Sequence, residues 1–150
     1  QYRAYYETTW PKKTVPYEGI PEMLDALSVR KIKCAVLSNK SDEFAGRMTA
    51  ALLPRWKFEA VKGLRLGAPR KPDPALALEI ASITGVDPAN TIFMGDSGID
   101  MQTASRANMV AVGVLWGFRE AEELLANGAR QLIKHPMELL KIIEGTHQLQ

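Results

Sequence analysis

Hydrophobic positions along the chain alternate between short apolar runs and longer segments with helical spacing. The short runs predict strands, and they lie at residues 32–37, 58–61, 91–94, 110–115 and 131–133. Most of them are continuously apolar, as is typical of strands that are covered on both faces of a sheet. Strands that alternate with helices predict an α/β fold with a parallel sheet.

The segments between these runs predict helices. They lie at about residues 21–30, from 41 onward, and at 74–85, 98–106, 119–126 and 136–143. Ser41 is a suitable N-cap for the second of these helices, and the two acidic residues after it favour the positive end of the helix dipole. Asp73 is predicted to cap the next helix with Pro74 at its first position, and Gly85 to end it.

The beginning of the chain has a different pattern. Tyr2, Tyr5 and Tyr6 have helical spacing, and a segment rich in Pro and Lys follows at residues 11–16. We interpret residues 1–15 as the last helix of one domain with its linker, and residues 16–150 as a second domain. A start in mid-helix, without methionine, predicts a piece of a longer protein.

Composition narrows the class of protein. The chain has 150 residues, 46% hydrophobic and 24% charged, as in an ordinary globular domain. A net charge of +2 does not favour a nucleic-acid partner, and no apolar stretch predicts a membrane span, so the cytoplasm is the expected location. Cys34 has no partner for an internal disulfide, and its apolar run predicts a position in the core.

Polar residues follow the first predicted strand, where Ser38, Asn39 and Lys40 come directly after Leu37. Ligands of open parallel sheets bind at the carboxyl ends of strands, so this hydroxyl and amide suit the oxygens of a phosphate. Ser and Asn are also common turn residues. The motif alone therefore leaves a purely structural role open.

A lysine stands just before a predicted helix in the sequence Lys71-Pro72-Asp73-Pro74. Two prolines stiffen this stretch, and a cation fixed there can neutralise charge on a transferring phosphoryl group. An ordinary surface lysine is the alternative interpretation.

Two aspartates flank the turn after residues 91–94, in the sequence Gly95-Asp96-Ser97-Gly98-Ile99-Asp100. The glycines permit a tight turn from strand to helix, and Asp100 lies one helical turn beyond Asp96. Two carboxylates so placed can share one hard cation, directly or through water. A helix cap followed by a surface aspartate is the alternative.

Taken together, these motifs resemble the haloacid dehalogenase superfamily over about residues 17–143, and the phosphoglycolate-phosphatase-like group in particular. The sequence Val114-Leu115-Trp116-Gly117-Phe118 and the Ala-Glu-Glu-Leu-Leu segment after it are similar to the carboxyl-terminal region of that group. The resemblance implies a Rossmann-like three-layer α/β/α sandwich with a parallel sheet. It also implies a small phosphorylated metabolite as substrate.

The resemblance implies a role for each site residue. Ser38 would hydrogen-bond the phosphoryl oxygens, and Asn39 would support that loop or meet the substrate. Lys40 would bind the substrate, and Lys71 would steady the charge of phosphate and nucleophile. Asp96 would coordinate Mg²⁺, with Asp100 as a second or outer carboxylate. Retention of Gly95-Asp96 favours the magnesium-dependent phosphatases over the metal-free dehalogenases.

The sequence departs from the family pattern in two places. Asn108 stands after Ala107 where the family usually has glycine. More seriously, the family's Asp-x-Asp-Gly-Thr motif is absent, and no Asp-x-Asp pair occurs in the sequence. That motif supplies the nucleophile, the general acid and metal ligands. Its absence implies an incomplete core without its first central strand, which an amino-terminal segment or a second chain would have to complete.

Three functions remain open. The first is the carboxyl-terminal portion of a magnesium-dependent phosphatase that works through a phosphoaspartate, with this chain alone inactive. The second is a non-catalytic phosphate-binding or regulatory module. The third is another hydrolase of the superfamily, such as a nucleotidase or phosphonate hydrolase.

Overall fold

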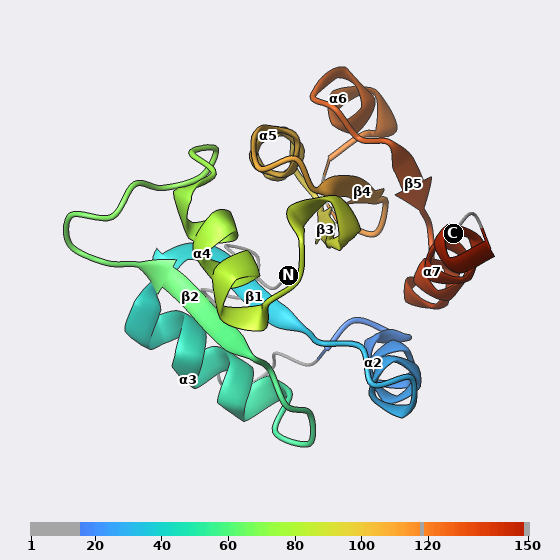
Figure 1. Ribbon diagram of the computed structural model, residues 1–150, viewed down its shortest axis with the longest axis horizontal. Helices are drawn as coiled ribbons and strands as arrows, with labels where there is room; N and C mark the ends of the chain where they lie inside the picture. Colours follow the sequence, from blue (N-terminus) through green and yellow to red (C-terminus); the bar gives the residue numbers. More distant parts are fainter. Residues whose placement is uncertain (1–15, 118, 149–150) are drawn as a thin grey trace.

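The computed structural model describes the chain over residues 16–117 and 119–148 (Figure 1). The strands of this part are β1 (Ala35–Ser41), β2 (Ala60–Leu64), β3 (Ile92–Gly95), β4 (Val110–Val114) and β5 (Gln131–Ile133). The α-helices are α2 (Ile20–Val29), α3 (Asp42–Leu52), α4 (Ala75–Thr84), α5 (Gly98–Arg106), α6 (Ala121–Ala126) and α7 (Leu139–Gln148). Two short 3-10 helices are η1 (Pro88–Asn90) and η2 (Pro136–Glu138).

All strand pairs among these residues are parallel, which confirms the predicted α/β class. They form two separate ladders. In one, β1 pairs with β2, with an irregular register between Leu37 and Ser41. In the other, the order is β3-β4-β5. Helices α2, α3 and α7 lie on one side of the strands, and α4, α5 and α6 lie on the other (Figure 1).

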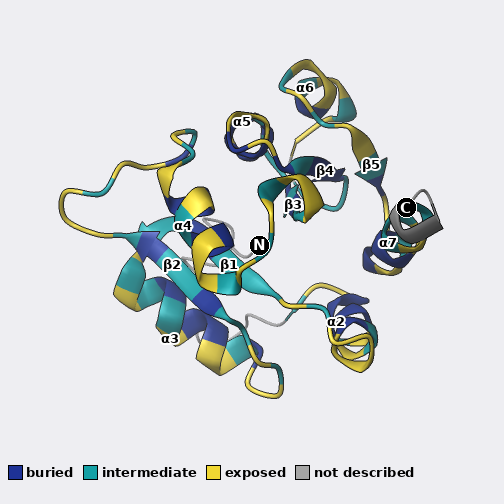
Figure 2. Ribbon diagram, in the orientation of Figure 1, coloured by how far each residue is buried: buried dark blue, intermediate teal, exposed yellow. Residues whose placement is uncertain are grey.

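Buried residues form two hydrophobic core clusters, and Figure 2 colours the buried positions dark blue. On one face, Leu76, Met101 and Leu124 bring α4, α5 and α6 onto the strands. On the other, Leu24 and Leu139 bring α2 and α7 onto β4 and β5. Helices that cover both faces of parallel strands give the expected three layers.

One edge of β1 and one edge of β3 have no described strand beside them, and we call the region between these two edges the interval. In the described part of the chain, β1 pairs only with β2, and β3 pairs only with β4. Leu37 of β1 and Phe93 of β3 nevertheless belong to the same core cluster. The ladders therefore form one body, and an edge of β1 and an edge of β3 both lie at its centre.

The first strand begins later than the apolar pattern predicted. Residues 32–34 precede β1 because the Ile32 N–H bonds to the Leu27 carbonyl and completes the end of α2. Cys34 is half-buried rather than deep in the core. Apolar character alone does not separate such a helix-terminal segment from the strand that follows it.

Helix ends follow the predicted caps with one correction. The Ser41 hydroxyl accepts a hydrogen bond from the Phe44 N–H, and Gly85 ends α4 with a φ of 73°. Pro74, however, is the N-cap of α4 and not its first residue. Asp73 still contributes, because its carboxylate accepts a bond from the Ala75 N–H at 2.8 Å.

The predicted domain division at residue 15 stays a prediction, because residues 1–15 lie outside the described part of the chain. Among the described helices, none has the length and apolar character needed to cross a membrane.

Candidate active site

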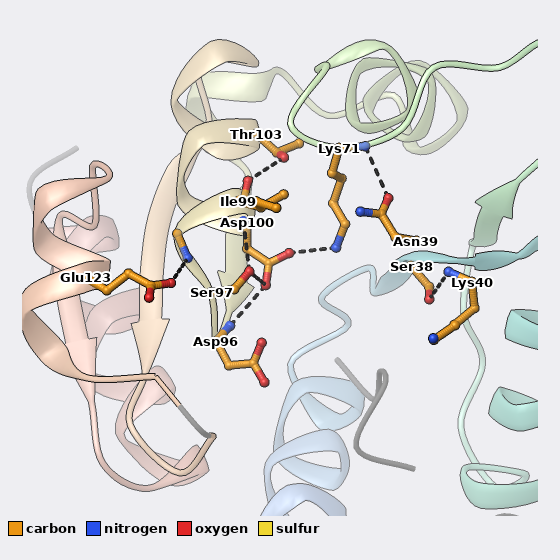
Figure 3. A network of polar contacts seen from close by, with 11 residues as sticks. Ser38, Asn39, Lys40, Lys71, Asp96, Ser97, Ile99, Asp100, Thr103 and Glu123 are labelled. Atoms are coloured by element: carbon orange, nitrogen blue, oxygen red, sulfur yellow. Dashed lines mark hydrogen bonds and ion pairs between the residues drawn. The ribbon is translucent and has the colours of Figure 1, made fainter. Parts of the chain in front are cut away.

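The polar motifs converge at the carboxyl ends of the strands that face the interval (Figure 3). Ser38 and Asn39 lie on β1, and Asp96 follows β3. Lys71 reaches in from the loop between β2 and α4, and Asp100 lies in the first turn of α5. Parallel strands place their carboxyl ends at one edge, which is where ligands of such sheets bind.

A buried ion pair forms the centre of this group. The Lys71 ammonium nitrogen lies 2.6 Å from Asp100 Oδ1, and both side chains are 0% exposed. The Lys71 backbone N–H donates to Asn39 Oδ1 at 3.1 Å, and the Lys71–Pro72 peptide bond is cis. These contacts connect the ends of β1 and α5 across the interval.

The buried Asp100 carboxylate also shapes the turn that carries Asp96. Its Oδ2 accepts hydrogen bonds from the Asp96 N–H at 3.1 Å and from the Ser97 hydroxyl at 3.2 Å. A Cβ at Gly95 would lie only 2.4 Å from the Asp100 Cβ, so this close approach needs glycine. In this arrangement Asp100 holds the turn and Lys71, and Asp96 is the more accessible carboxylate of the two.

Ser38 lies on the opposite side of the interval from Asp96 (Figure 3). Its side chain is buried at 2% exposure, and its hydroxyl oxygen accepts a hydrogen bond from the Lys40 N–H at 3.0 Å. A serine hydroxyl that accepts one bond still has its own proton to donate. The Ser38 hydroxyl therefore keeps a proton that it could donate to an anion.

Two further residues support the Asp96 turn and were not among the predicted site residues. Glu123 of α6 accepts a hydrogen bond from the Gly98 N–H at 2.9 Å, at the start of α5. A Cβ at Gly117 would lie 2.7 Å from the Asp96 Cβ, so the turn after β4 packs directly on the aspartate. Both contacts join segments far apart in the sequence, and spacing gives no signal for them.

The site has few oxygen ligands for Mg²⁺. In the part of the chain that the structure describes, no group of three or more His, Cys, Asp or Glu residues is placed to hold a metal ion. Asp100 is engaged with Lys71, which leaves Asp96 as the accessible carboxylate. Mg²⁺ prefers octahedral oxygen coordination. These residues by themselves do not fit a complete magnesium site.

The haloacid dehalogenase-like hydrolase family model matches residues 1–114, which include every predicted site residue. The chain belongs to this family.

Three relatives of this haloacid dehalogenase-like chain are named as phosphatases. The phosphoglycolate phosphatase of Aquifex aeolicus is 27% identical over 96% of the chain and 66% of the relative. That of Xylella fastidiosa is 33% identical over 79% of the chain and 52% of the relative. The N-acetylmuramic acid 6-phosphate phosphatase of Pseudomonas aeruginosa is 29% identical over 86% of the chain and 58% of the relative.

The structural similarity also covers only part of the relative. A crystal structure from Lactobacillus delbrueckii, provisionally assigned as a phosphoglycolate phosphatase, superposes with a TM-score of 0.84 at 33% identity. The superposition covers 93% of this chain and 58% of the Lactobacillus delbrueckii chain. The chain thus spans about half to two thirds of the length of these relatives.

We expect this haloacid dehalogenase-like chain to bind Mg²⁺ only weakly, in the millimolar range. Asp96 supplies one carboxylate, and Mg²⁺ gives up its water reluctantly for so few protein ligands. Isothermal titration calorimetry of the wild-type chain and of Asp96→Asn measures this directly. A micromolar affinity that Asp96→Asn removes would contradict the expectation.

Replacing Lys71 by methionine should lower the free energy of unfolding by about 3–5 kcal/mol, because it leaves the Asp100 carboxylate buried without its cation. Lys57→Met is the matched control, since the Lys57 side chain is 83% exposed and its partner Glu59 is 30% exposed. That control should change stability by less than about 1 kcal/mol. Urea unfolding followed by circular dichroism compares them, and equal losses would refute the role of the pair.

Proposed function

We propose that this chain is the carboxyl-terminal part of a magnesium-dependent phosphatase that hydrolyses a small phosphomonoester through a phosphoaspartate. The observation that supports this proposal most is the position of Ser38, Lys71 and Asp96. They come together at the carboxyl ends of the strands, on both sides of the interval between β1 and β3. In the proposal, a strand with the Asp-x-Asp motif occupies that interval in the complete enzyme. The chain without it is inactive.

Each side chain has a task that follows from its contacts. Ser38 donates its hydroxyl proton to a phosphoryl oxygen, and the Lys40 N–H fixes the orientation of that hydroxyl. Lys71 offsets the negative charge that gathers when a carboxylate attacks a phosphate. Because Lys71 is held by Asp100 and Asn39, it is positioned before substrate binds, which is the main requirement for electrostatic stabilisation of a transition state.

The proposal assigns Asp96 to magnesium in the complete enzyme. Asp96 lies half-buried at the end of β3, and Asp100, Glu123 and Gly117 all support its turn. The remaining ligands would come from the segment with the nucleophile. A bound Mg²⁺ would supply charge neutralisation at the phosphate.

Phosphoglycolate is the first substrate that the proposal names. Four of the named or structurally similar proteins above carry phosphatase names, and three of those names specify phosphoglycolate. The Pseudomonas aeruginosa relative, named for a sugar 6-phosphate, makes phosphorylated amino sugars the second class to examine.

A chimera tests the proposal. The part of the Aquifex aeolicus phosphatase that precedes its match to this chain is fused ahead of Gln1, and the product is assayed with Mg²⁺ on phosphoglycolate, N-acetylmuramic acid 6-phosphate and a nucleoside monophosphate. We expect hydrolysis of phosphoglycolate. Lys71→Met in the chimera should lower kcat by about 10²–10³-fold, as for loss of one preorganised charge-stabilising group.

The chimera also separates the alternatives. A preference for the nucleotide would favour a nucleotidase. A folded chimera that binds phosphate but hydrolyses none of the substrates would favour a non-catalytic phosphate-binding module and overturn the proposal.

A further inference from the structure

A cavity lies at the end of the molecule opposite the candidate active site. Its volume is about 390 Å³. It is lined by Leu24, Ser28, Lys31, Ile32, Lys33, Cys34, Trp56, Lys57 and Glu59. Residues 31–34 lead into the amino end of β1, whereas Ser38 stands toward its carboxyl end. The cavity is therefore separate from the phosphate-handling residues.

The apolar wall of this cavity is fixed by contacts outside it. The Trp56 indole N–H donates to Asp25 Oδ1 at 2.9 Å, and the Arg55 guanidinium carbon lies 4.4 Å from the centre of the Trp56 ring. Leu24 is buried against the core, and Ile32 packs at its edge. A half-open pocket with a volume near 400 Å³ and one aromatic side chain, Trp56, is within the size range of small-molecule sites.

The charges around the cavity are mainly positive. The lining contains three lysines, Lys31, Lys33 and Lys57, and a single acidic residue, Glu59. The Lys57 ammonium lies 3.8 Å from a Glu59 oxygen, and the Lys33 ammonium donates to the Thr84 carbonyl at 2.7 Å. Lys31 is exposed and has no side-chain ion pair among the residues that the structure describes. The cavity thus joins an apolar wall to a cationic rim.

We propose that this cavity is a second ligand site that binds a small organic anion with an apolar body. The aromatic wall accepts the body, and the lysines at the rim pair with the carboxylate or other acidic group. The site is independent of the phosphatase reaction, so it stands whether or not the proposed function is correct.

The chain carries its own reporter for this site. Cys34 is the single cysteine of the sequence and lies on the cavity wall. Burial, and secondly the nearby Glu59 carboxylate, raise the pKa of the Cys34 thiol. Because the thiolate is the reactive form, alkylation should be slow at neutral pH and should become faster as pH rises above the usual range of a thiol. A ligand in the cavity should slow it further.

The test uses 2-naphthalenesulfonate, an anion with an aromatic body that a phosphatase cannot hydrolyse, and neutral 2-naphthol as its matched control. Binding to the chain is measured by equilibrium dialysis, and alkylation of Cys34 by iodoacetamide is followed by intact mass. We expect the sulfonate to bind saturably and to slow alkylation at least threefold. Neutral 2-naphthol should bind more weakly and should slow alkylation much less.

Variants locate the effect. Lys31→Gln with Lys57→Gln should weaken sulfonate binding by about three- to tenfold, because exposed charge pairs each contribute modestly. Added salt should also weaken it. Arg106→Gln, an exposed residue of α5 outside this cavity, should leave binding unchanged. Equal binding of the two probes, unaltered Cys34 alkylation, or unaltered binding by the lysine variant would each overturn the proposal.

Discussion

Protein of this sequence should release no measurable p-nitrophenol from p-nitrophenyl phosphate in the presence of Mg²⁺. The sequence contains no Asp-x-Asp pair to supply a nucleophile and a general acid. Among the described residues, the buried carboxylate of the site, Asp100, is paired with Lys71 and is not presented to a substrate. Without a nucleophile, the reaction loses the covalent route that divides a difficult displacement into two easier steps.

The assay needs protein whose intact mass matches the 16.6 kDa of this sequence, because a trace of a host phosphatase would mimic activity. Asp96→Asn serves as the control for contamination. Residual turnover that the variant leaves unchanged does not come from this site. Robust turnover that Asp96→Asn abolishes would show that the chain is catalytic by itself, and the proposed role of an upstream segment would be wrong.

Local chemistry explains which parts of the fold could be predicted from the sequence. The sequence predicts the strands and helices because apolar runs and helical spacing are properties of neighbouring residues. Ser41 and Gly85 marked helix ends because capping depends on a single side chain or a single backbone conformation. The predicted start of β1 was wrong, because the Ile32 backbone N–H bonds to the end of a helix and not to a neighbouring strand.

The arrangement of the candidate site depends on contacts that the sequence does not encode locally. Lys71 and Asp100 are 29 residues apart, and nothing in either motif shows that they form a buried pair. That pair gives Asp100 a positioning role in this structure, while its predicted role as a second carboxylate for Mg²⁺ stays a prediction. Glu123 supports the Asp96 turn from another helix, and only the fold places it there.

The interval between the ladders connects the chemistry of the chain to its stability. Ser38 and Asp96 lie on opposite sides of it, and the edges of β1 and β3 border it. A strand inserted there would satisfy both edges and would end at the level of the site residues. The same segment that supplies a nucleophile in the proposed function would therefore also complete the hydrogen bonding of the sheet.

Among the described residues, β1 and β3 each have one edge that no described strand pairs with, so we expect the chain alone to associate in solution. Each buried backbone group left without a partner costs about 1–3 kcal/mol. Several such groups along β1 and β3 would rival the whole stability of a small domain, about 5–15 kcal/mol. Unpaired strand edges are also templates for pairing with another chain. We expect dimers or larger species in size-exclusion chromatography with light scattering, increasing with protein concentration.

The chimera with the upstream segment is the matched control, because it presents the same described residues with a candidate strand for the interval. It should be less associated than the chain alone and should unfold at a higher urea concentration. Hydrogen exchange separates the possible causes, since protection gained at β1 and β3 in the chimera places the new strand between them. A chain that is a monodisperse monomer, with cooperative unfolding and exchange-protected edges on β1 and β3, would show that its own residues already close the sheet.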